Sequence, residues 1–144
     1  MNENRFFSNE YTGTKTFHQQ NVPTANATGF GSPSDDYMER GIDLNEQLIK
    51  NKAATFFMRV QGNSMINAGI HHGDVVIVDR SITAKSGHVI IAVINGDMLI
   101  RRLERTAQRV RLLPETTQLS PIDVTDQMDF SVWGVVTYII KFVG

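Results

Sequence analysis

The chain has 144 residues, of which 41% are hydrophobic and 20% are charged, and its formal net charge at pH 7 is -1. This length and composition suit one domain with a buried core, and a charge so close to zero argues against tight, charge-driven binding to a nucleic acid or a membrane. The absence of cysteine excludes disulfides, cysteine nucleophiles and metal sites built on thiolates.

The first 40 residues differ in composition from the rest of the chain. They are rich in Asn, Thr, Ser and Gly, and their aromatic residues follow no regular period: Phe6, Phe7, Tyr11, Phe17, Phe30 and Tyr37. Burial offsets little of the ordering entropy of such a segment. Residues 1–40 are therefore predicted to form a flexible arm and residues 41–144 a folded domain. Six aromatic residues indicate an arm that docks on a surface, its own domain included, and an ordinary disordered tail is the alternative.

Neither a membrane span nor a secretory signal is recognisable in the sequence. No apolar run reaches the roughly 18 residues of a membrane span, and the N-terminal MNENRFFSNEYTGTK lacks the apolar stretch of a signal peptide. We therefore expect a soluble, cytoplasmic protein.

A short helix is predicted in IDLNEQLIKN, residues 42–51. Asp43 can cap it, with Glu46 three residues on as the partner in a capping box. The apolar side chains of Leu44, Leu48 and Ile49 then fall on one face, as expected for a helix that packs on the domain.

After this helix, β-branched and aromatic runs predict strands. The runs cover residues 54–60, 74–79, 88–94, 98–103, 109–113 and 130–143. Asn95-Gly96 predicts a tight hairpin, because both positions tolerate positive φ, and His71–Asp74 and Ser86-Gly87 mark further turns. The last run is long enough to bend at Gly134 and serve two sheets. Short strands at this spacing predict a mostly β domain, closed or partly closed.

A serine stands in a glycine-flanked turn after the first of these runs, in VQGNSMINAGI, residues 60–70. One interpretation makes Ser64 the cap of a short helix that ends at Gly69, and on local evidence alone this interpretation is favoured. The other makes Ser64 a nucleophile, which requires a base to take its proton.

Four stretches carry a resemblance that favours the nucleophile: GFGSPSDDYMERGIDLNEQLI, ATFFMRVQGNSM, GIHHGDVVIVDRSITAKSGHVI and WGVV. From about Gly29 to Phe142 the chain is similar to the LexA-like self-cleaving peptidases and, within them, to the UmuD family. The resemblance implies a mostly β fold of small twisted sheets with one or two short helices, a homodimer, and a serine–lysine dyad that cuts the protein's own N-terminal arm.

The resemblance also implies partners. In the UmuD family the cut is stimulated by RecA filaments on single-stranded DNA, and the trimmed dimer joins the catalytic subunit of DNA polymerase V for translesion synthesis in the SOS response. The sliding clamp and UmuD or LexA paralogues are further candidate partners. Neither a cofactor nor a metal ion is implied.

The resemblance places Ser64, in GNSM, at the nucleophile position, and counting on without gaps places Arg101, in GDMLIRRL, where the family has its lysine. A buried lysine can become a base because desolvation disfavours its ammonium form. Removing a proton from arginine at pH 7 instead costs about 7–9 kcal/mol. Arg102 has the same chemical defect, and none of the lysines of the chain aligns with the dyad position.

Two histidines are the remaining candidate bases near the serine in sequence. His71 and His72 lie in a glycine-bounded turn, which would have to fold back onto Ser64. Some distant relatives use a histidine as the base, but at the position that Arg101 occupies here. We therefore predict that neither histidine activates the serine.

The expected cleavage site also departs from the pattern of the family, which cuts before a glycine and usually after alanine or cysteine. The matching bond is Thr28–Gly29, with Gly31 where close relatives tend to carry proline. Threonine is β-branched and fits a small side-chain pocket poorly. Together with Arg101, this predicts a protein that keeps the fold and dimer of the family but cuts itself very slowly or not at all.

Other polar and aromatic residues are given structural interpretations. Five arginines, at positions 101, 102, 105, 109 and 111, form either a basic patch for DNA or the solvated face of a hairpin balanced by Glu104 and Glu115; the second is favoured. Met65 and Trp133 are predicted in the core or a dimer contact. Asp35-Asp36 predicts a solvated turn rather than a metal site.

Three function classes follow. The chain is an active self-peptidase that matures into a polymerase subunit, a non-cleaving regulatory subunit that binds the polymerase or active paralogues, or a DNA-binding repressor of the LexA type. We reject the repressor, because residues 1–40 show no helix-turn-helix pattern. The first two share fold and partners and differ in catalysis.

Overall fold

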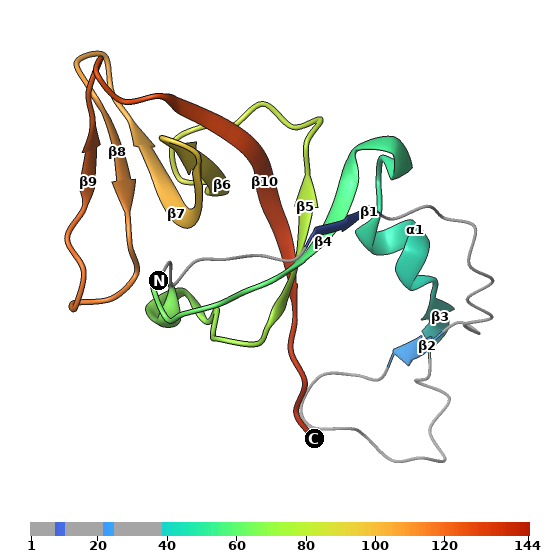
Figure 1. Cartoon of the computed structure of the whole chain (residues 1–144). Helices are drawn as coiled ribbons and strands as arrows, with labels where there is room; N and C mark the ends of the chain where they lie inside the picture. Colours follow the sequence, from blue (N-terminus) through green and yellow to red (C-terminus); the bar gives the residue numbers. More distant parts are fainter. Residues whose placement is uncertain (1–7, 11–21, 25–38) are drawn as a thin grey trace.

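A computed structural model of the chain describes the backbone of residues 8–10, 22–24 and 39–144, and side chains from residue 43 onward. One antiparallel sheet of eight strands dominates it, in the order β1-β4-β5-β10-β6-β7-β8-β9 (Figure 1). Its strands are β1 Ser8–Glu10, β4 Thr55–Arg59, β5 Val75–Asp79, β6 Val89–Ile94, β7 Asp97–Arg105, β8 Val110–Leu113, β9 Ile122–Val124 and β10 Phe130–Ile140. A second, two-stranded sheet pairs β2 Val22–Thr24 with β3 Glu39–Ile42. The predicted mostly β fold is confirmed.

The helices in the described part of the chain are short, as expected. Helix α1 spans Leu44–Leu48, and two 3-10 helices span Lys52–Ala54 and Ile66–Ala68. Asp43 caps α1 as predicted, with its Oδ1 accepting the N–H of Asn45 at 3.0 Å and of Glu46 at 3.4 Å. Leu44, Leu48 and Ile49 are half-buried, but the helix ends before residue 49, whose backbone is already extended.

Strand β10 lies inside the large sheet, between β5 and β6. Its first half pairs with β6 from Phe130 to Val135, and its second half pairs with β5 from Val135 to Ile140. The register shifts next to Gly134, where an added Cβ would lie 2.5 Å from Val78 Cγ1. The predicted irregularity at Gly134 is therefore present, although β10 pairs with β5 on one side and β6 on the other within one sheet and does not serve two separate sheets.

The β6–β7 hairpin places the residues that matter for the site. Asn95 has a φ of 49° and Gly96 a φ of 87°, which is the turn predicted from this residue pair. The register of the hairpin sets Ile100 opposite Ile91 and Arg101 opposite Ile90.

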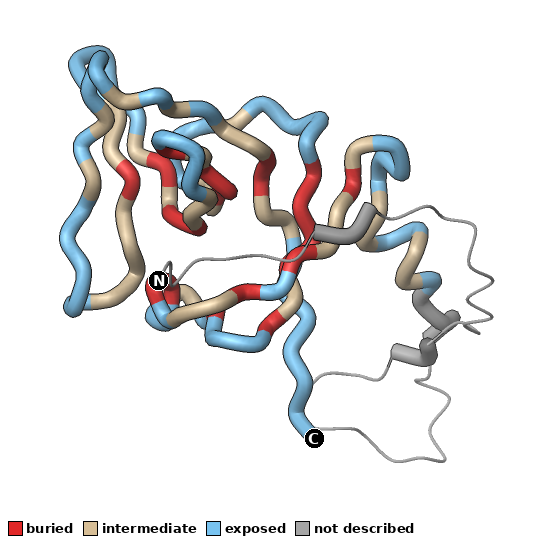
Figure 2. The backbone as a smooth tube through the Cα atoms, viewed as in Figure 1, coloured by how far each residue is buried: buried red, intermediate tan, exposed pale blue. Residues whose placement is uncertain are grey.

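The core has two hydrophobic clusters on opposite faces of β6, which is buried on both sides (Figure 2). Because successive residues of a strand point to opposite faces, Ile91 packs in the first cluster while Ile90 and Ala92 pack in the second. The first cluster includes Met65 and Ile100, and so it lies directly under the serine turn.

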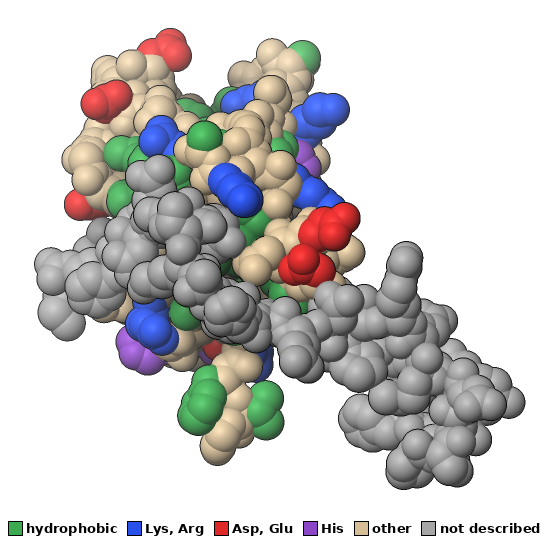
Figure 3. Space-filling model, turned by 90° about the vertical axis from the view of Figure 1, so that its right-hand side faces the viewer, with side chains coloured by type: hydrophobic (Ala, Val, Ile, Leu, Met, Phe, Trp, Pro, Cys, Tyr) green, Lys and Arg blue, Asp and Glu red, His purple; other side chains and the backbone are tan. Residues whose placement is uncertain are grey.

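The chain ends in an exposed apolar segment. Hydrophobic side chains protrude at the C-terminal end of the molecule (Figure 3), where Phe142 and Val143 are each 92% exposed. No helix in the described ranges is both long and apolar enough to cross a membrane.

Candidate active site

Ser64 is buried at the start of the turn that follows β4, with 2% of its surface exposed. Its Oγ lies 3.5 Å from the carbonyl oxygen of Ile100 on β7. The N-cap of the following 3-10 helix is Met65, and Gly69, with a φ of 82°, ends the helix. The capping interpretation of Ser64 is therefore wrong, because its side chain is directed at the neighbouring strand, while the predicted helix end at Gly69 is correct.

Arg101 lies on β7 and is also buried, with 6% of its surface exposed. Its Nη1 donates a hydrogen bond of 2.8 Å to the carbonyl oxygen of Ile100, the same atom that faces Ser64 Oγ. The structure thus brings together the two residues singled out in the sequence, 37 positions apart. Their roles as nucleophile and base position stay predictions.

One side of the serine turn is held by Glu115, in the segment after β8. The N–H of Glu115 donates to the carbonyl of Ser64 at 2.8 Å, and its carbonyl accepts the N–H of Asn67 at 2.8 Å. The carboxylate of Glu115 lies 2.6 Å from Nε of Arg102, and Nη1 of Arg102 donates to the carbonyl of Gly87. Arg102 therefore anchors the segment that holds the serine.

The other side of the turn is held by the residues that precede β5. The N–H of Gly62 donates to Nδ1 of His72 at 3.0 Å, and the N–H of His72 donates to Oδ1 of Asn63 at 3.3 Å. Backbone bonds between Val60 and the pair Gly73 and Asp74 complete this contact. The serine turn is thus clamped between two segments that are distant from one another in sequence.

Comparison with known proteins assigns the chain to a peptidase family. The model of the family described as Peptidase S24-like matches residues 22–137. The chain belongs to that family. The resemblance to LexA-like and UmuD-like proteins that the motifs indicated is thereby confirmed.

Individual relatives span most of this S24-like chain. Protein MucA of Salmonella typhimurium is 35% identical over 113 residues, which cover 78% of this chain and 77% of MucA. Protein ImpA of Shigella flexneri is 38% identical over 116 residues, covering 78% and 76%. LexA repressor 1 of Xanthomonas axonopodis pv. citri is 37% identical over 115 residues, covering 80% of this chain and 57% of the repressor.

Ser64 and Arg101, which both contact the carbonyl of Ile100, have different hydrogen-bonding and acid–base chemistry. A serine hydroxyl can donate or accept a hydrogen bond, whereas a guanidinium has five N–H donors and no acceptor. Arg101 can therefore supply positive charge and hydrogen bonds next to Ser64, but it cannot receive the hydroxyl proton without first losing one of its own. The hydroxyl of Ser64 donates to the carbonyl of Ile100 at 3.5 Å, which is at the limit of a hydrogen bond.

The two histidines near Ser64 in sequence contact other groups. The turn of His71 and His72 does fold onto the serine turn, but at Gly62 and Asn63. Nδ1 of His72 is occupied by the N–H of Gly62, and Nδ1 of His71 lies 3.1 Å from Nζ of Lys141. Both rings are at the surface while Ser64 is buried, which agrees with the prediction that neither activates it.

Several backbone amides of the serine turn already make hydrogen bonds within the fold. The N–H groups of Asn67, Ala68, Gly69 and Ile70 donate to backbone carbonyls of Glu115, Met65 and Ile66. These four amides are therefore engaged within the fold and are not available to stabilise an oxyanion.

The expected cleavage site at Thr28 and Gly29 lies outside the described residues, and so does Asp35-Asp36. The proposed cut and its register therefore stay predictions. Among the residues that are described, His, Cys, Asp and Glu form no group of three or more that could hold a metal ion.

The five arginines do not share one surface. Arg101 is buried, Arg102 pairs with Glu115, and Arg111 lies 3.4 Å from Glu104 and 3.2 Å from Asp123. Arg105 and Arg109 are exposed. This agrees with the hairpin interpretation and with the predicted balance by Glu104 and Glu115, and it disfavours a continuous basic patch for DNA.

Met65 and Trp133 have the structural roles expected of them. Met65 is fully buried in the first core cluster, and Trp133 packs against that cluster. The Trp133 ring makes an edge contact with the ring of Phe56, at 5.0 Å between ring centroids. The guanidinium carbon of Arg80 lies over the Trp133 ring, 4.3 Å from its centroid.

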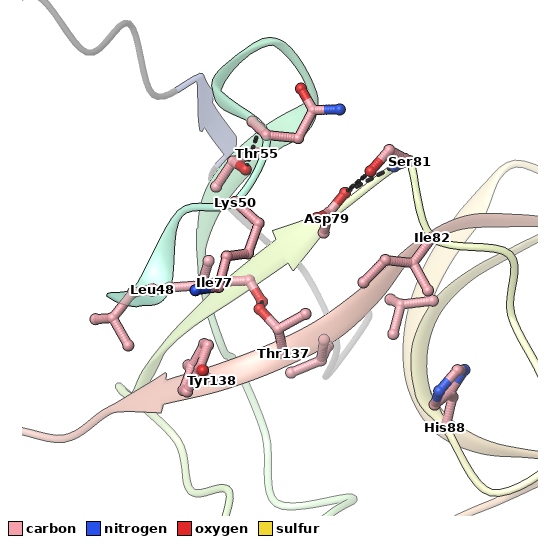
Figure 4. Close-up of a pocket in the computed structure, with 13 residues that line it drawn as sticks. Leu48, Lys50, Thr55, Ile77, Asp79, Ser81, Ile82, His88, Thr137 and Tyr138 are labelled. Carbon is pink, nitrogen blue, oxygen red and sulfur yellow. Dashed lines mark hydrogen bonds between the residues drawn. The ribbon is translucent and has the colours of Figure 1, made fainter. Parts of the chain in front are cut away.

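Away from Ser64, a hollow of about 720 Å³ is lined by a serine, an aspartate and a histidine that sequence reasoning did not single out (Figure 4). Ser81 Oγ donates to Oδ1 of Asp79 at 2.6 Å. His88 lies apart from this pair, with Ile82 between them in the view, and its Nδ1 accepts the N–H of Lys85 at 3.0 Å. The three residues therefore do not form a catalytic triad, which would need the histidine between the serine and the carboxylate.

Proposed function

We propose that this chain is a UmuD-like protein of SOS mutagenesis that has kept the peptidase scaffold and the serine of its family but cuts its own arm very slowly or not at all. The observation that carries the proposal is the position of Arg101, buried and donating to the carbonyl of Ile100 that also faces Ser64. Family membership supports the scaffold and the pathway, and Arg101 supports the loss of cleavage.

The free energy needed to deprotonate Arg101 decides between an active self-peptidase and a non-cleaving regulatory subunit. Making a guanidinium neutral at pH 7 costs about 7–9 kcal/mol before any bond is broken. This corresponds to a neutral fraction of about one side chain in 10⁵ to 10⁷. A lysine at the same buried position loses its proton far more readily. We therefore favour a non-cleaving regulatory subunit over an active self-peptidase.

The partners of such a subunit follow from the family. We propose that it forms a homodimer and binds the catalytic subunit of polymerase V or UmuD and LexA paralogues, with the RecA filament and the sliding clamp as further contacts in the cytoplasm. An uncut subunit that pairs with active paralogues would hold them in the uncut state. LexA repressor 1 extends well beyond the matched part, so its role as a repressor is not carried over.

The exposed C-terminal end supports the homodimer. Its apolar side chains are accessible: Tyr138, Ile139, Ile140, Phe142 and Val143. Beyond Val135, the described strands pair with β10 along its β5 side, which leaves its other edge for a second copy of the chain. Phe142→Asp should weaken the dimer in sedimentation experiments, and Leu119→Asp, at another exposed apolar position, should not. A dimer unaffected by Phe142→Asp would place the interface elsewhere.

Self-cleavage is tested with purified full-length protein, RecA, single-stranded DNA and a nucleotide, resolved on a gel. We expect the native chain to stay intact and Arg101→Lys to release a fragment that begins at Gly29. Arg101→Met is the matched control, because it fills a similar volume without an amine. Ser64→Ala in the Arg101→Lys chain should abolish the cut.

Two outcomes of this experiment would change the proposal. If the native chain is cut and Ser64→Ala prevents the cut, the chain is an active self-peptidase and the proposed loss of cleavage is refuted. If Arg101→Lys stays intact, the test moves to the bond itself, and Thr28→Ala is added to the same chain. Cleavage that appears only in the chain with both Arg101→Lys and Thr28→Ala would assign the defect to both residues.

A further inference from the structure

We propose that His72 is a positioning residue which holds the serine turn only while its imidazole is uncharged, so that the order of this turn depends on pH. The proposal rests on the proposed function insofar as it concerns the same serine. It adds a residue that neither the dyad chemistry nor the family comparison points to.

The contact that carries the proposal is the hydrogen bond from Gly62 to His72. Gly62 precedes Ser64 by two residues, and its φ of 88° places it in the left-handed region that favours glycine. Its N–H donates to Nδ1 of His72 at 3.0 Å, and Oδ1 of Asn63 accepts the N–H of His72 at 3.3 Å. The ring and the backbone of one residue therefore hold two consecutive residues of the serine turn.

The direction of this hydrogen bond fixes the charge state of the ring. A backbone N–H can only donate, so Nδ1 of His72 must carry a lone pair, and the ring proton must reside on Nε2. Protonation puts a hydrogen on both ring nitrogens and removes the acceptor. A protonated ring would therefore meet the N–H of Gly62 as a second donor, and the hydrogen bond would be lost.

The surroundings of His72 contain charges of both signs. The ring borders a hollow of about 610 Å³ that is also lined by Arg59 of β4, by Asp74 before β5 and by Lys141 after β10, and a basic group and a histidine lie close together above the C-terminal end in Figure 3. Asp74 is bound to Lys141, Arg59 donates to the carbonyl of Gly73, and His71 faces Lys141.

The two sides of the clamp respond differently to acid. On the side of Glu115, the bonds to Ser64 and Asn67 join backbone groups, which do not titrate. On the side of His72, the bond to Gly62 depends on a ring that does. Acidification should therefore loosen Gly62 and Asn63 while the bond between Ser64 and Glu115 persists.

Amide exchange with solvent, measured by NMR on the full-length protein, tests this residue by residue. In the native chain the protection of the Gly62 amide should fall about 3- to 10-fold between pH 8 and pH 5, as expected for the loss of one hydrogen bond. His72→Ala should lower it by the same factor already at pH 8. His72→Asn, whose side-chain oxygen can accept in place of Nδ1, should keep it high at both pH values.

His88 provides the matched control, because its Nδ1 accepts the N–H of Lys85 at the same distance of 3.0 Å in another turn. His88→Ala should leave Gly62 unchanged and lower the protection of Lys85. Equal protection of Gly62 in the native chain and in His72→Ala would overturn the proposal, and so would the same pH response in the native chain and in His72→Asn. Because exchange is measured without cleavage, this result is independent of the gel experiment above.

Discussion

The site is built in two halves that differ in what determines them. The serine half, β4 and the turn to Gly69, is held by backbone hydrogen bonds and by glycines with positive φ. The base half is the β6–β7 hairpin, in which Arg101, at the expected base position, donates to the carbonyl of Ile100 that also faces Ser64. The position of the serine turn therefore depends on many contacts, whereas the expected base position depends on one residue.

This difference explains how such a protein can lose catalysis and keep its structure. Lysine and arginine both have long aliphatic stems and a terminal cation, so either can occupy the same position on a strand. The proton transfer, by contrast, needs a group that becomes neutral near pH 7. On the proposed function, arginine in place of lysine would remove the base, while the hydrophobic clusters on the two faces of β6 are present in this chain.

The largest effect should come from the base half. In Arg101→Lys, self-cleavage should exceed that of the native chain by about 10³-fold or more. Its rate should rise about tenfold per pH unit until the new lysine is mostly neutral, because the rate follows the neutral fraction of the base. The measurement is a time course on gels at several pH values. A rate in Arg101→Lys that does not change with pH would contradict a lysine base.

The next largest effect is expected for a substitution in β10, the strand that connects the two halves. Strand β10 connects β5, on the side of the serine, with β6, on the side of Arg101, and a Cβ at Gly134 would meet Val78 at 2.5 Å. Gly134→Ala should lower the free energy of unfolding by about 1–3 kcal/mol through overpacking, measured by denaturant titration. Ser131→Ala, at an exposed position of the same strand, serves as control. Equal stability of the two variants would show that β10 can shift to accommodate the methyl group.

The anchor of the serine half gives a smaller effect. Arg102→Met removes the ion pair with Glu115, whose partners are each about one third exposed (34% and 30%). We expect a loss of about 0.5–1 kcal/mol and, in NMR exchange, lower protection of the Glu115 and Asn67 amides. Arg105→Met, at an exposed position of the same strand, should leave both amides protected. If the two variants behave alike, Arg102 does not anchor the segment that holds Ser64.

The sequence predicts those elements whose residues carry a strong local pattern. Each of the six apolar runs overlaps one strand, and the Asn95-Gly96 turn and the Asp43 cap form as expected. Strand β9 is missed, because three residues in Ile122–Val124 are too few to show an alternating pattern. The predicted helix is too long, because its apolar positions continue beyond the residue at which the backbone becomes extended.

The site is less accessible to such reasoning, because its contacts join distant positions. Ser64 meets the carbonyl of Ile100 across 36 residues, and Arg102 meets Glu115 across 13. Local pattern alone favoured a helix cap for Ser64, and the family resemblance located Arg101. Alternation along β7 does separate a buried residue 101 from a half-buried residue 102, so the different roles of the two arginines could have been anticipated once the strand was aligned.

The smallest effect is expected at the edge of the serine half, where Asp74 precedes β5. Burial acts to raise the pKa of Asp74, but the hydrogen bonds from Lys141 and from the N–H of His71, together with their charges, outweigh it, so that the pKa lies below its ordinary value.

A carboxylate with a lowered pKa stabilises the fold above its unfolded pKa, near 4, and this contribution is lost as the pH falls through the folded pKa. Lys141 is 44% exposed while Asp74 is 7% exposed, so solvent screens the pair. Lys141→Met should cost about 0.2–1 kcal/mol at pH 7 and almost nothing at pH 2, measured by denaturant titration at both pH values. A cost that is the same at both would mean that Lys141 stabilises β10 through its aliphatic stem and not through Asp74.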